Sequence, residues 1–209
     1  MKNKHTLELL QLTMLGAIVF VLAFTPFLGY IPLGVTKATI IHIPVIIGAI
    51  ILGPKKGAIL GALFGLTSLI MNTISPTVTS FVFSPFYSIG DVNGNFLSLV
   101  ICFVPRILVG VVPYYVYQAL KTRIKQTTSL AVAGLAGSLT NTILVMSLIY
   151  LFFAESYAAA KGVSVNALYG VIMSIIGING VPEAILASVL TASITMAVFK
   201  ITKQGKAVR

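Results

Sequence analysis

The chain has 209 residues, of which 57% are hydrophobic and 9% are charged, and its mean hydropathy is +1.04. A soluble domain has about 25% charged residues, so this composition excludes a soluble globule and indicates an integral membrane protein. The formal net charge is +10, but the basic residues stand between apolar runs and not among exposed aromatic residues, which excludes a nucleic-acid-binding face.

The apolar runs predict a bundle of membrane helices. Most of them are about 20 residues long and lack the alternation of apolar and polar residues that barrel strands show, so they are expected to be transmembrane α-helices. The six expected spans are residues 7–28, 40–52, 56–72, 96–119, 130–153 and 181–199. The sequence thus predicts an all-α integral membrane protein with a single six-helix domain over residues 1–209.

Two of these runs have unusual lengths. The run 40–52 is too short for a hydrocarbon core about 30 Å thick, so either Gly34–Thr39 continues the helix or the bundle shields it. The apolar segment Ala167–Ile178 is too short to cross alone, and joined to the last span it would be longer than a crossing requires. The Gly-Ile-Asn-Gly sequence at 177–180 therefore predicts a bent or re-entrant start of the last span.

The basic residues predict the orientation of the bundle. Of the 14 Lys and Arg residues, 11 fall in segments on one side, Lys37 and Lys161 fall on the other, and Arg106 lies within a span. Cytoplasmic segments carry the excess of Lys and Arg, so both termini are expected in the cytoplasm of a multi-pass protein of the cell membrane. Lys55, Lys56 and the basic C-terminus are interpreted as topology and lipid-headgroup signals.

Two segments on the other side differ from the basic turns. Residues 29–38 carry Thr36 and Lys37, and residues 75–95 carry two prolines and four aromatic residues. Structureless loops longer than about 12–15 residues tend to be functional or disordered, and the aromatic residues argue against disorder. We expect a lid over a cavity, with inert packing on the bundle as the alternative.

The third span carries a strip of small residues that ends near a polar one. Gly57, Gly61 and Gly65 follow one another at four-residue spacing, which places bare backbone on one helix face and predicts a close helix–helix approach. Asn72 lies near the outer end of the same span. Its side chain either caps the helix or lines a cavity.

Arg106 lies in the middle of the fourth span. An arginine at the centre of a membrane helix costs about 2.5–3.5 kcal/mol on insertion scales, so it is expected to face protein, an acidic partner, a water-filled cavity or a ligand. Asn141 lies at a similar depth in the fifth span, where its amide makes an interhelical hydrogen bond or binds a ligand. Glu183 is the one acid within an apolar run; it either belongs to a helix start or faces inward to pair with Arg106 or a ligand hydroxyl.

Other kinds of chemistry lack the residues that they need. His42 follows Thr39 by three residues, but no second His, Cys or acid stands at metal-ligand spacing, so no metal site is expected. The spans contain no paired carboxylates, and the chain has no G-x-x-x-x-G-K-[ST] motif for nucleotide hydrolysis. We therefore expect no enzyme and no cofactor. A few convergent polar groups inside apolar walls are typical of a small-ligand pocket.

Four stretches carry a family resemblance. They are PFLGYIPLG at 26–34, ATIIHIPVIIGAIILGPKKGAILGALFGLTSL at 38–69, SFVFSPFYS at 80–88 and VPRILVGVVPYYVY at 104–117. They resemble the substrate-binding S components of energy-coupling factor (ECF) vitamin transporters, most closely the pantothenate-specific branch. The resemblance covers the first four spans, and the last two match mainly in layout.

The resemblance implies a vitamin-binding subunit in a bacterial cytoplasmic membrane. It would join a membrane coupling subunit and two ATP-binding-cassette ATPases, which would supply the energy. In the family a small-residue A-x-x-x-A face of the first helix docks on the coupling subunit, and Thr13 and Ala17 stand at the nearest pattern here.

Pantothenate has one carboxylate, one amide and two hydroxyl groups around a gem-dimethyl group. With this ligand Arg106 would hold the carboxylate, Asn141 the amide and Glu183 the hydroxyl groups. The expected site also includes Asn72 and Thr39, apolar walls from Phe81 or Phe86, and Lys37 or His42 as a further positive partner.

Other functions stay open at this point. Another vitamin, such as folate or riboflavin, is the nearest alternative ligand. A self-sufficient ion-coupled carrier or channel is a second class, although the chain is small and shows no half-to-half repeat. An intramembrane enzyme acting on lipids or isoprenoids is a third class, and it lacks the acid pairs or metal ligands that such chemistry usually needs.

Overall fold

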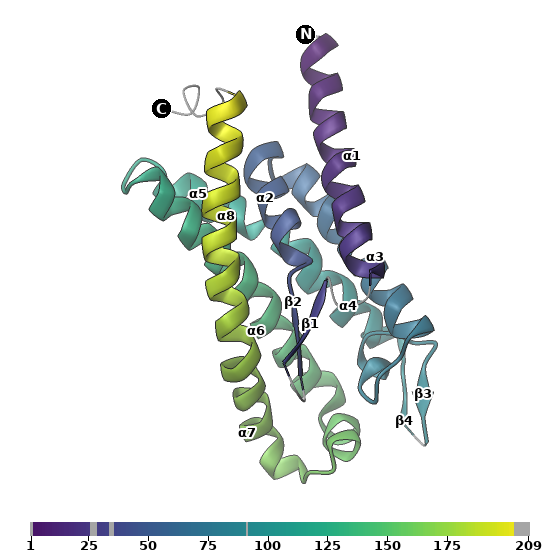
Figure 1. Cartoon of the computed structure of the whole chain (residues 1–209). Coiled ribbons are helices and arrows are strands. Elements are labelled where there is room, and N and C mark those ends of the chain that lie inside the picture. The colour runs from purple at the N-terminus through teal and green to yellow at the C-terminus, as the bar shows by residue number, and fades with distance from the viewer. Residues whose placement is uncertain (1, 26–28, 34–35, 91, 203–209) are drawn as a thin grey trace.

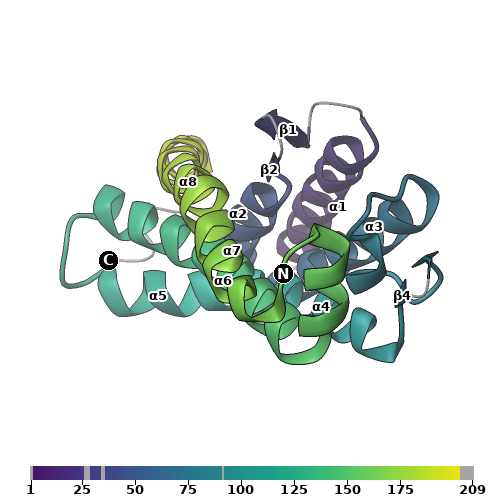
Figure 2. The same cartoon turned by 90° about the horizontal axis from the view of Figure 1, so that it is seen from below.

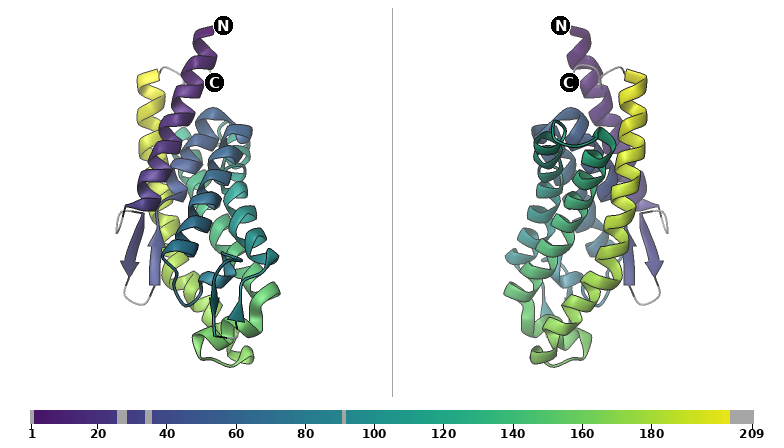
Figure 3. Two further views of the ribbon diagram at one scale, coloured as in Figure 1. Left: turned by 90° about the vertical axis from the view of Figure 1, so that its right-hand side faces the viewer. Right: turned by 90° about the vertical axis from the view of Figure 1, so that its left-hand side faces the viewer.

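The computed structural model describes residues 2–25, 29–33, 36–90 and 92–202, and the described chain is mainly helical (Figure 1). Its helices are α1 (Lys2–Phe24), α2 (His42–Leu52), α3 (Pro54–Ile74), α4 (Phe96–Val109), α5 (Val112–Leu120), α6 (Gln126–Lys161), α7 (Val165–Ile175) and α8 (Val181–Thr202). A 3₁₀ turn, η1 (Ser80–Val82), and a π-helical segment, η2 (Ile176–Gly180), complete the helical elements. Helix α1 begins and α8 ends at the same end of the bundle (Figure 3).

Five helical stretches of the described chain are long and apolar enough to cross a membrane. They are residues 5–24, 54–74, 96–120, 126–161 and 165–202. Helix α2 has 11 residues, which span about 16 Å at 1.5 Å per residue. It is therefore shorter than a hydrocarbon core of about 30 Å, and the count of six complete crossings stays a prediction.

Helix α2 lies in the middle of the bundle. Its residues His42–Ile50 are all buried, and it contacts α1, α3, α5, α6 and α8 (Figure 2). Of the two explanations for the short run, shielding by the bundle is confirmed. Continuation of the helix by Gly34–Thr39 is wrong, because Thr36–Thr39 forms strand β2.

The fourth expected span consists of two helices, α4 and α5, which break at Gly110 and Val111. Pro113 lies in the first turn of α5 and has no N–H to donate to Val109, four residues earlier. A hydropathy pattern does not detect this break, because the residues on both sides are apolar.

The last two helices form one stretch. Segment η2 joins α7 to α8 through π-helical turns, so the described chain has no re-entrant loop here. Pro182 cannot donate to the carbonyl of Ile178 and its ring crowds that carbonyl. A π-helical turn is wider than an α-helical turn, and such turns often occur where the regular hydrogen bonds of a helix are interrupted.

Helix α6 extends beyond its expected end at residue 153. Phe153 has φ −134° and ψ 25°, so the helix bends there and then continues to Lys161. Gly162 ends it with φ 67°, a left-handed conformation that glycine adopts without steric cost. The part before the bend, from Gln126 to residue 152, is about 40 Å long at 1.5 Å per residue and is long enough to cross the hydrocarbon core by itself.

Two small hairpins lie away from the end of the bundle where α1 begins. Strands β1 (Tyr30–Leu33) and β2 (Thr36–Thr39) pair antiparallel between α1 and α2. Strands β3 (Ser88–Ile89) and β4 (Val92–Asn93) pair in the same way between η1 and α4. Figures 1 and 3 show both hairpins in the half of the bundle that contains the α6–α7 turn.

The glycine strip brings α3 and α4 into backbone contact, as the sequence predicts. A Cβ atom added at Gly57 would overlap the carbonyl oxygen of Gly110, and one added at Gly61 would overlap the carbonyl oxygen of Arg106. Gly65 faces the ring of Phe103, 2.8 Å from an added Cβ. This contact fixes the position of Arg106 against α3.

Candidate ligand-binding site

A cavity of about 480 Å³ opens between α3, α4, α6, η2 and the first turn of α8. Its volume falls within the range of about 300–1,000 Å³ that small-molecule sites occupy. Its described lining includes three charged residues, Arg106, Lys161 and Glu183, and the amides of Asn72, Asn141 and Asn179. Aromatic and aliphatic side chains form the rest of the wall, Phe64, Phe83, Val145 and Ile149 among them.

Arg106 is held within its own helix. Pro105 has no N–H, so within the helix it cannot donate to the carbonyl oxygen of Ile101, four residues earlier. Arg106 Nη1 donates to this same oxygen at 2.7 Å. Pro105 thus leaves the Ile101 carbonyl without its helical donor, and Arg106 provides a donor in its place. This hydrogen bond offsets part of the cost of a buried cation.

Two aromatic rings complete the surroundings of Arg106. Its guanidinium carbon lies 5.7 Å from the ring centroid of Phe64 and 5.0 Å from that of Phe83. Cations are attracted to ring faces within about 6 Å of the centroid. The side chain is only 7% exposed and lines the cavity, so it provides a buried, oriented cation for a ligand.

Glu183 connects α8 to the β1–β2 hairpin. Its side chain is 8% exposed, and Oε1 accepts a hydrogen bond from the backbone N–H of Thr39 at 2.6 Å. The two residues are 144 positions apart, so this contact joins the end of β2 to the wall of the cavity. Glu183 lies in the first turn of α8, which follows the π-helical turns of η2, and it also contacts Thr39 and lines the cavity.

Asn141 provides an acceptor inside the cavity. Its side chain is 8% exposed, and Oδ1 has no hydrogen-bond partner among the described residues. A buried polar atom left without a partner costs about 1–3 kcal/mol. A ligand that donates an N–H or O–H to this oxygen would recover that energy.

Asn72 both lines the cavity and anchors the segment 75–95. Its Nδ2 donates to the carbonyl oxygen of Ser68 at 2.8 Å, and its Oδ1 accepts from Ser80 Oγ at 2.7 Å. A second bond joins Thr73 Oγ1 and Ser84 Oγ at 2.7 Å. Residues of this segment, including Thr77 and Thr79, form one wall of the cavity, and its role as a lid stays a prediction.

The remaining residues of the expected site lie elsewhere. His42 is fully buried at the start of α2, Phe81 packs on Phe153 with ring centroids 5.9 Å apart, and Phe86 is 75% exposed. None of the three lines the cavity. The backbone of Lys37 belongs to β2, and its side chain lies outside the described part of the chain.

Phe83, Tyr157 and Lys161 line the cavity without having been expected there. Phe83 directly follows the 3₁₀ turn η1 and lines the cavity, whereas Phe81 and Phe86 do not. Tyr157 and Lys161 reach it because α6 continues past Phe153. The sequence signal for this extension is the run Ala158–Ala160, which favours helix, followed by Gly162 as a helix end.

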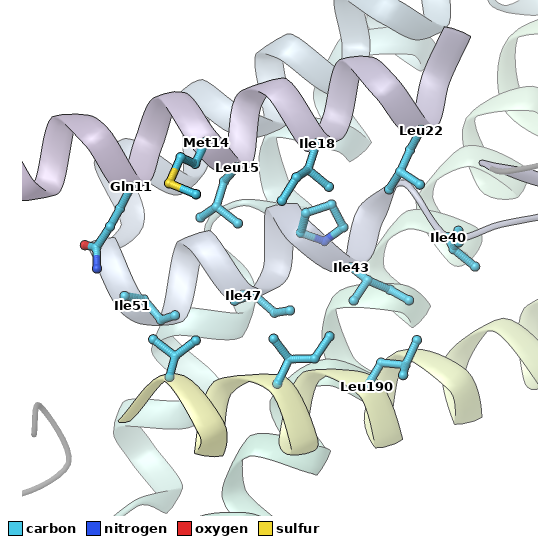
Figure 4. Close-up of a pocket in the computed structure, with 13 residues that line it drawn as sticks. Gln11, Met14, Leu15, Ile18, Leu22, Ile40, Ile43, Ile47, Ile51 and Leu190 are labelled. Carbon is cyan, nitrogen blue, oxygen red and sulfur yellow. The ribbon is translucent and has the colours of Figure 1, made fainter. Parts of the chain in front are cut away.

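A second cavity, an apolar groove of about 440 Å³, lies between α1, α2 and α8 (Figure 4). Figure 4 shows Met14, Leu15 and Ile18 of α1 facing Ile47 of α2. All described lining residues except Gln11 are apolar, so the groove lacks the polar groups that would orient a vitamin.

The two residues expected to dock a partner lie near this groove on α1. Thr13 and Ala17 are both exposed, and Thr13 Oγ1 donates back to the carbonyl oxygen of Leu9 at 3.0 Å. The hydroxyl group is thus satisfied within the helix, which leaves a small, smooth surface at this position.

Comparison with known proteins identifies the family. The model of the substrate-specific component of ECF transporters matches residues 8–195. The pantothenic acid transporter PanT of Lactococcus lactis subsp. cremoris (strain MG1363) is 44% identical over 165 residues, 78% of this chain and 79% of the relative. The pantothenate transporter PanT of Leuconostoc mesenteroides subsp. mesenteroides is 31% identical over 201 residues, 93% of each chain. The chain therefore belongs to the family of substrate-specific components of ECF transporters.

Proposed function

We propose that the chain is the pantothenate-binding subunit of an ECF-type importer. The observation that carries the proposal is the cavity that gathers Arg106, Asn141 and Glu183 from three helices. The names of the two relatives support the same ligand. The carboxylate, the amide and the hydroxyl groups of pantothenate are the kinds of group that these three side chains bind.

Each group of the ligand has a chemical counterpart in the cavity. Arg106 binds the carboxylate through charge-assisted hydrogen bonds. Asn141 Oδ1 accepts from the amide N–H, and Glu183 accepts from a hydroxyl group. The gem-dimethyl group packs against the apolar wall that includes Val145 and Ile149.

Equilibrium binding to the purified chain tests this function. Radiolabelled pantothenate is the appropriate probe because the chain has no tryptophan whose fluorescence could report binding. We expect saturable binding that unlabelled pantothenate displaces and that folate and riboflavin do not. Tight binding of another vitamin without binding of pantothenate would contradict the proposed ligand and leave the family assignment unchanged.

Energy for transport would come from partner proteins. The chain lacks a phosphate-binding loop, so we propose that a membrane coupling subunit and two ATP-binding-cassette ATPases join it in the cell membrane. The coupling subunit would dock on the α1 face that contains Thr13 and Ala17, with both termini in the cytoplasm. Liposomes that contain this chain alone should not accumulate pantothenate, and accumulation driven by an ion gradient would favour the self-sufficient carrier.

Glu183 is expected to control how long the ligand stays bound. Glu183→Ala removes the acceptor of the Thr39 N–H, so the β1–β2 hairpin loses its bond to α8. Hydrogen bonds to charged groups contribute about 1.5–3 kcal/mol, so pantothenate should dissociate about tenfold to a hundredfold faster. Release of labelled pantothenate after dilution measures this rate.

Two further variants test the role of the Glu183 side chain in retaining the ligand. Glu183→Gln keeps an acceptor oxygen, so pantothenate should dissociate more slowly from it than from Glu183→Ala. Glu155→Ala removes an equal charge from an exposed position of α6 outside the cavity lining and should match the parent. An unchanged release rate in Glu183→Ala would contradict the proposed bond between hairpin and wall.

A further inference from the structure

The described cavity lining carries two cations and one acid. Arg106 and Lys161 are the cations, and Glu183 is the acid. A single arginine facing a single carboxylate would leave little attraction for an anionic ligand. Because Lys161 is also present, the described lining has one more positive than negative charge.

The two cations differ in exposure. Arg106 is 7% exposed, whereas Lys161 is exposed at the end of α6. Because both line the same cavity, Arg106 marks its buried part and Lys161 its rim. An exposed rim charge and a buried charge affect different steps of binding.

The position of Lys161 is set by the fold. Gly162 ends α6 directly after it, and its Nζ lies 5.8 Å from the ring centroid of Tyr157, one helical turn earlier. Tyr157 is buried and also lines the cavity. This cation–π contact holds the ammonium group beside a ring that also lines the cavity.

We propose that Lys161 is the capture residue of the site: it attracts the anionic ligand to the rim and so selects for a carboxylate before Arg106 binds it. This inference rests on the proposed function, because it takes pantothenate as the ligand. A rim charge acts mainly on the association rate and on its dependence on salt. The dissociation rate should depend on the buried groups.

The test compares two ligands in the parent and in Lys161→Gln. Pantothenate is the anion, and panthenol has the same skeleton with a neutral alcohol in place of the carboxylate. Lys161→Gln should lower the association rate of pantothenate about threefold to tenfold at low ionic strength and leave that of panthenol unchanged. Rapid filtration of the labelled ligands on the purified chain measures both rates.

Salt provides a second readout that a structural role would not change. At about 0.5 M salt, charges are screened within a few ångströms, so the parent and Lys161→Gln should associate at similar rates. Dissociation rates should agree within about twofold at every salt concentration. Lys161→Arg keeps the charge and should restore most of the parent rate.

A matched control lies at the other end of the same helix. Lys125 precedes the first residue of α6, is exposed and does not line the cavity. Lys125→Gln changes the net charge by the same amount as Lys161→Gln, and it should leave the association rates of both ligands unchanged.

The outcomes separate the two proposals. Equal association rates in the parent and Lys161→Gln would overturn the capture role alone, as would an equal loss for panthenol. Absence of pantothenate binding to the parent would overturn the proposed function and this inference with it.

Discussion

Replacing Arg106 with alanine should abolish high-affinity pantothenate binding while the chain still folds. Loss of one partner of a buried charge pair costs about 2–5 kcal/mol, which raises the dissociation constant between about thirtyfold and a few thousandfold. Insertion should not suffer, because a central arginine is itself unfavourable in a membrane helix. Equilibrium binding and the melting temperature of the purified chain measure the two effects.

Two variants serve as references for Arg106→Ala. Arg123→Ala removes the same charge from an exposed turn between α5 and α6 and should bind as the parent does. Arg106→Lys keeps the charge but lacks the planar set of N–H donors of arginine. Its affinity for pantothenate should lie between those of the parent and Arg106→Ala. Misfolding of Arg106→Ala, with normal binding after the fold is rescued, would make Arg106 a structural partner of Glu183.

Replacing Gly61 with alanine should destabilise the whole bundle. The new Cβ would overlap the carbonyl oxygen of Arg106 and lie 2.8 Å from the Cα of Ile107, so α3 and α4 must separate. Overpacking of cores costs about 1–3 kcal/mol and occasionally more. A clash with backbone belongs to the upper part of that range, because backbone atoms cannot rotate away as a side chain does.

The melting temperature and pantothenate affinity of Gly61→Ala should therefore fall together, since the shift of α4 also displaces Arg106. Gly170→Ala is the matched control, because an added Cβ at Gly170 has no atom within 4 Å in the described structure. In the interior of α7 this change should raise stability slightly, as alanine favours helix by about 1 kcal/mol over glycine. A stable Gly61→Ala chain that binds normally would contradict the backbone contact.

Much of the membrane architecture follows from patterns within single segments. The glycine spacing of residues 57–65 predicts the contact of α3 with α4, because small residues at i and i+4 act through their own helix face. Arg106 and Asn141 are recognised as candidate site residues because a polar group in an apolar span is energetically costly. These features need no knowledge of the partner element to be recognised.

Other features depend on contacts between distant segments and could not be predicted. The bond of Glu183 to Thr39 joins positions 144 apart, and no local pattern contains both ends. Lys161 and Phe83 line the cavity after the bend at Phe153 and the 3₁₀ turn η1, two backbone features that hydropathy does not record. The proline-induced break before α5 is hidden for the same reason.

The arrangement of Pro105, Arg106 and the Ile101 carbonyl has a consequence for how the cavity can be altered. The hydrogen bond that offsets part of the cost of the buried cation lies within six consecutive residues of one helix. Substitutions on α6 can therefore change the shape and hydrogen-bonding of the cavity while this bond within α4 stays in place. The position of the guanidinium group and the form of the opposite wall are thus set by different helices.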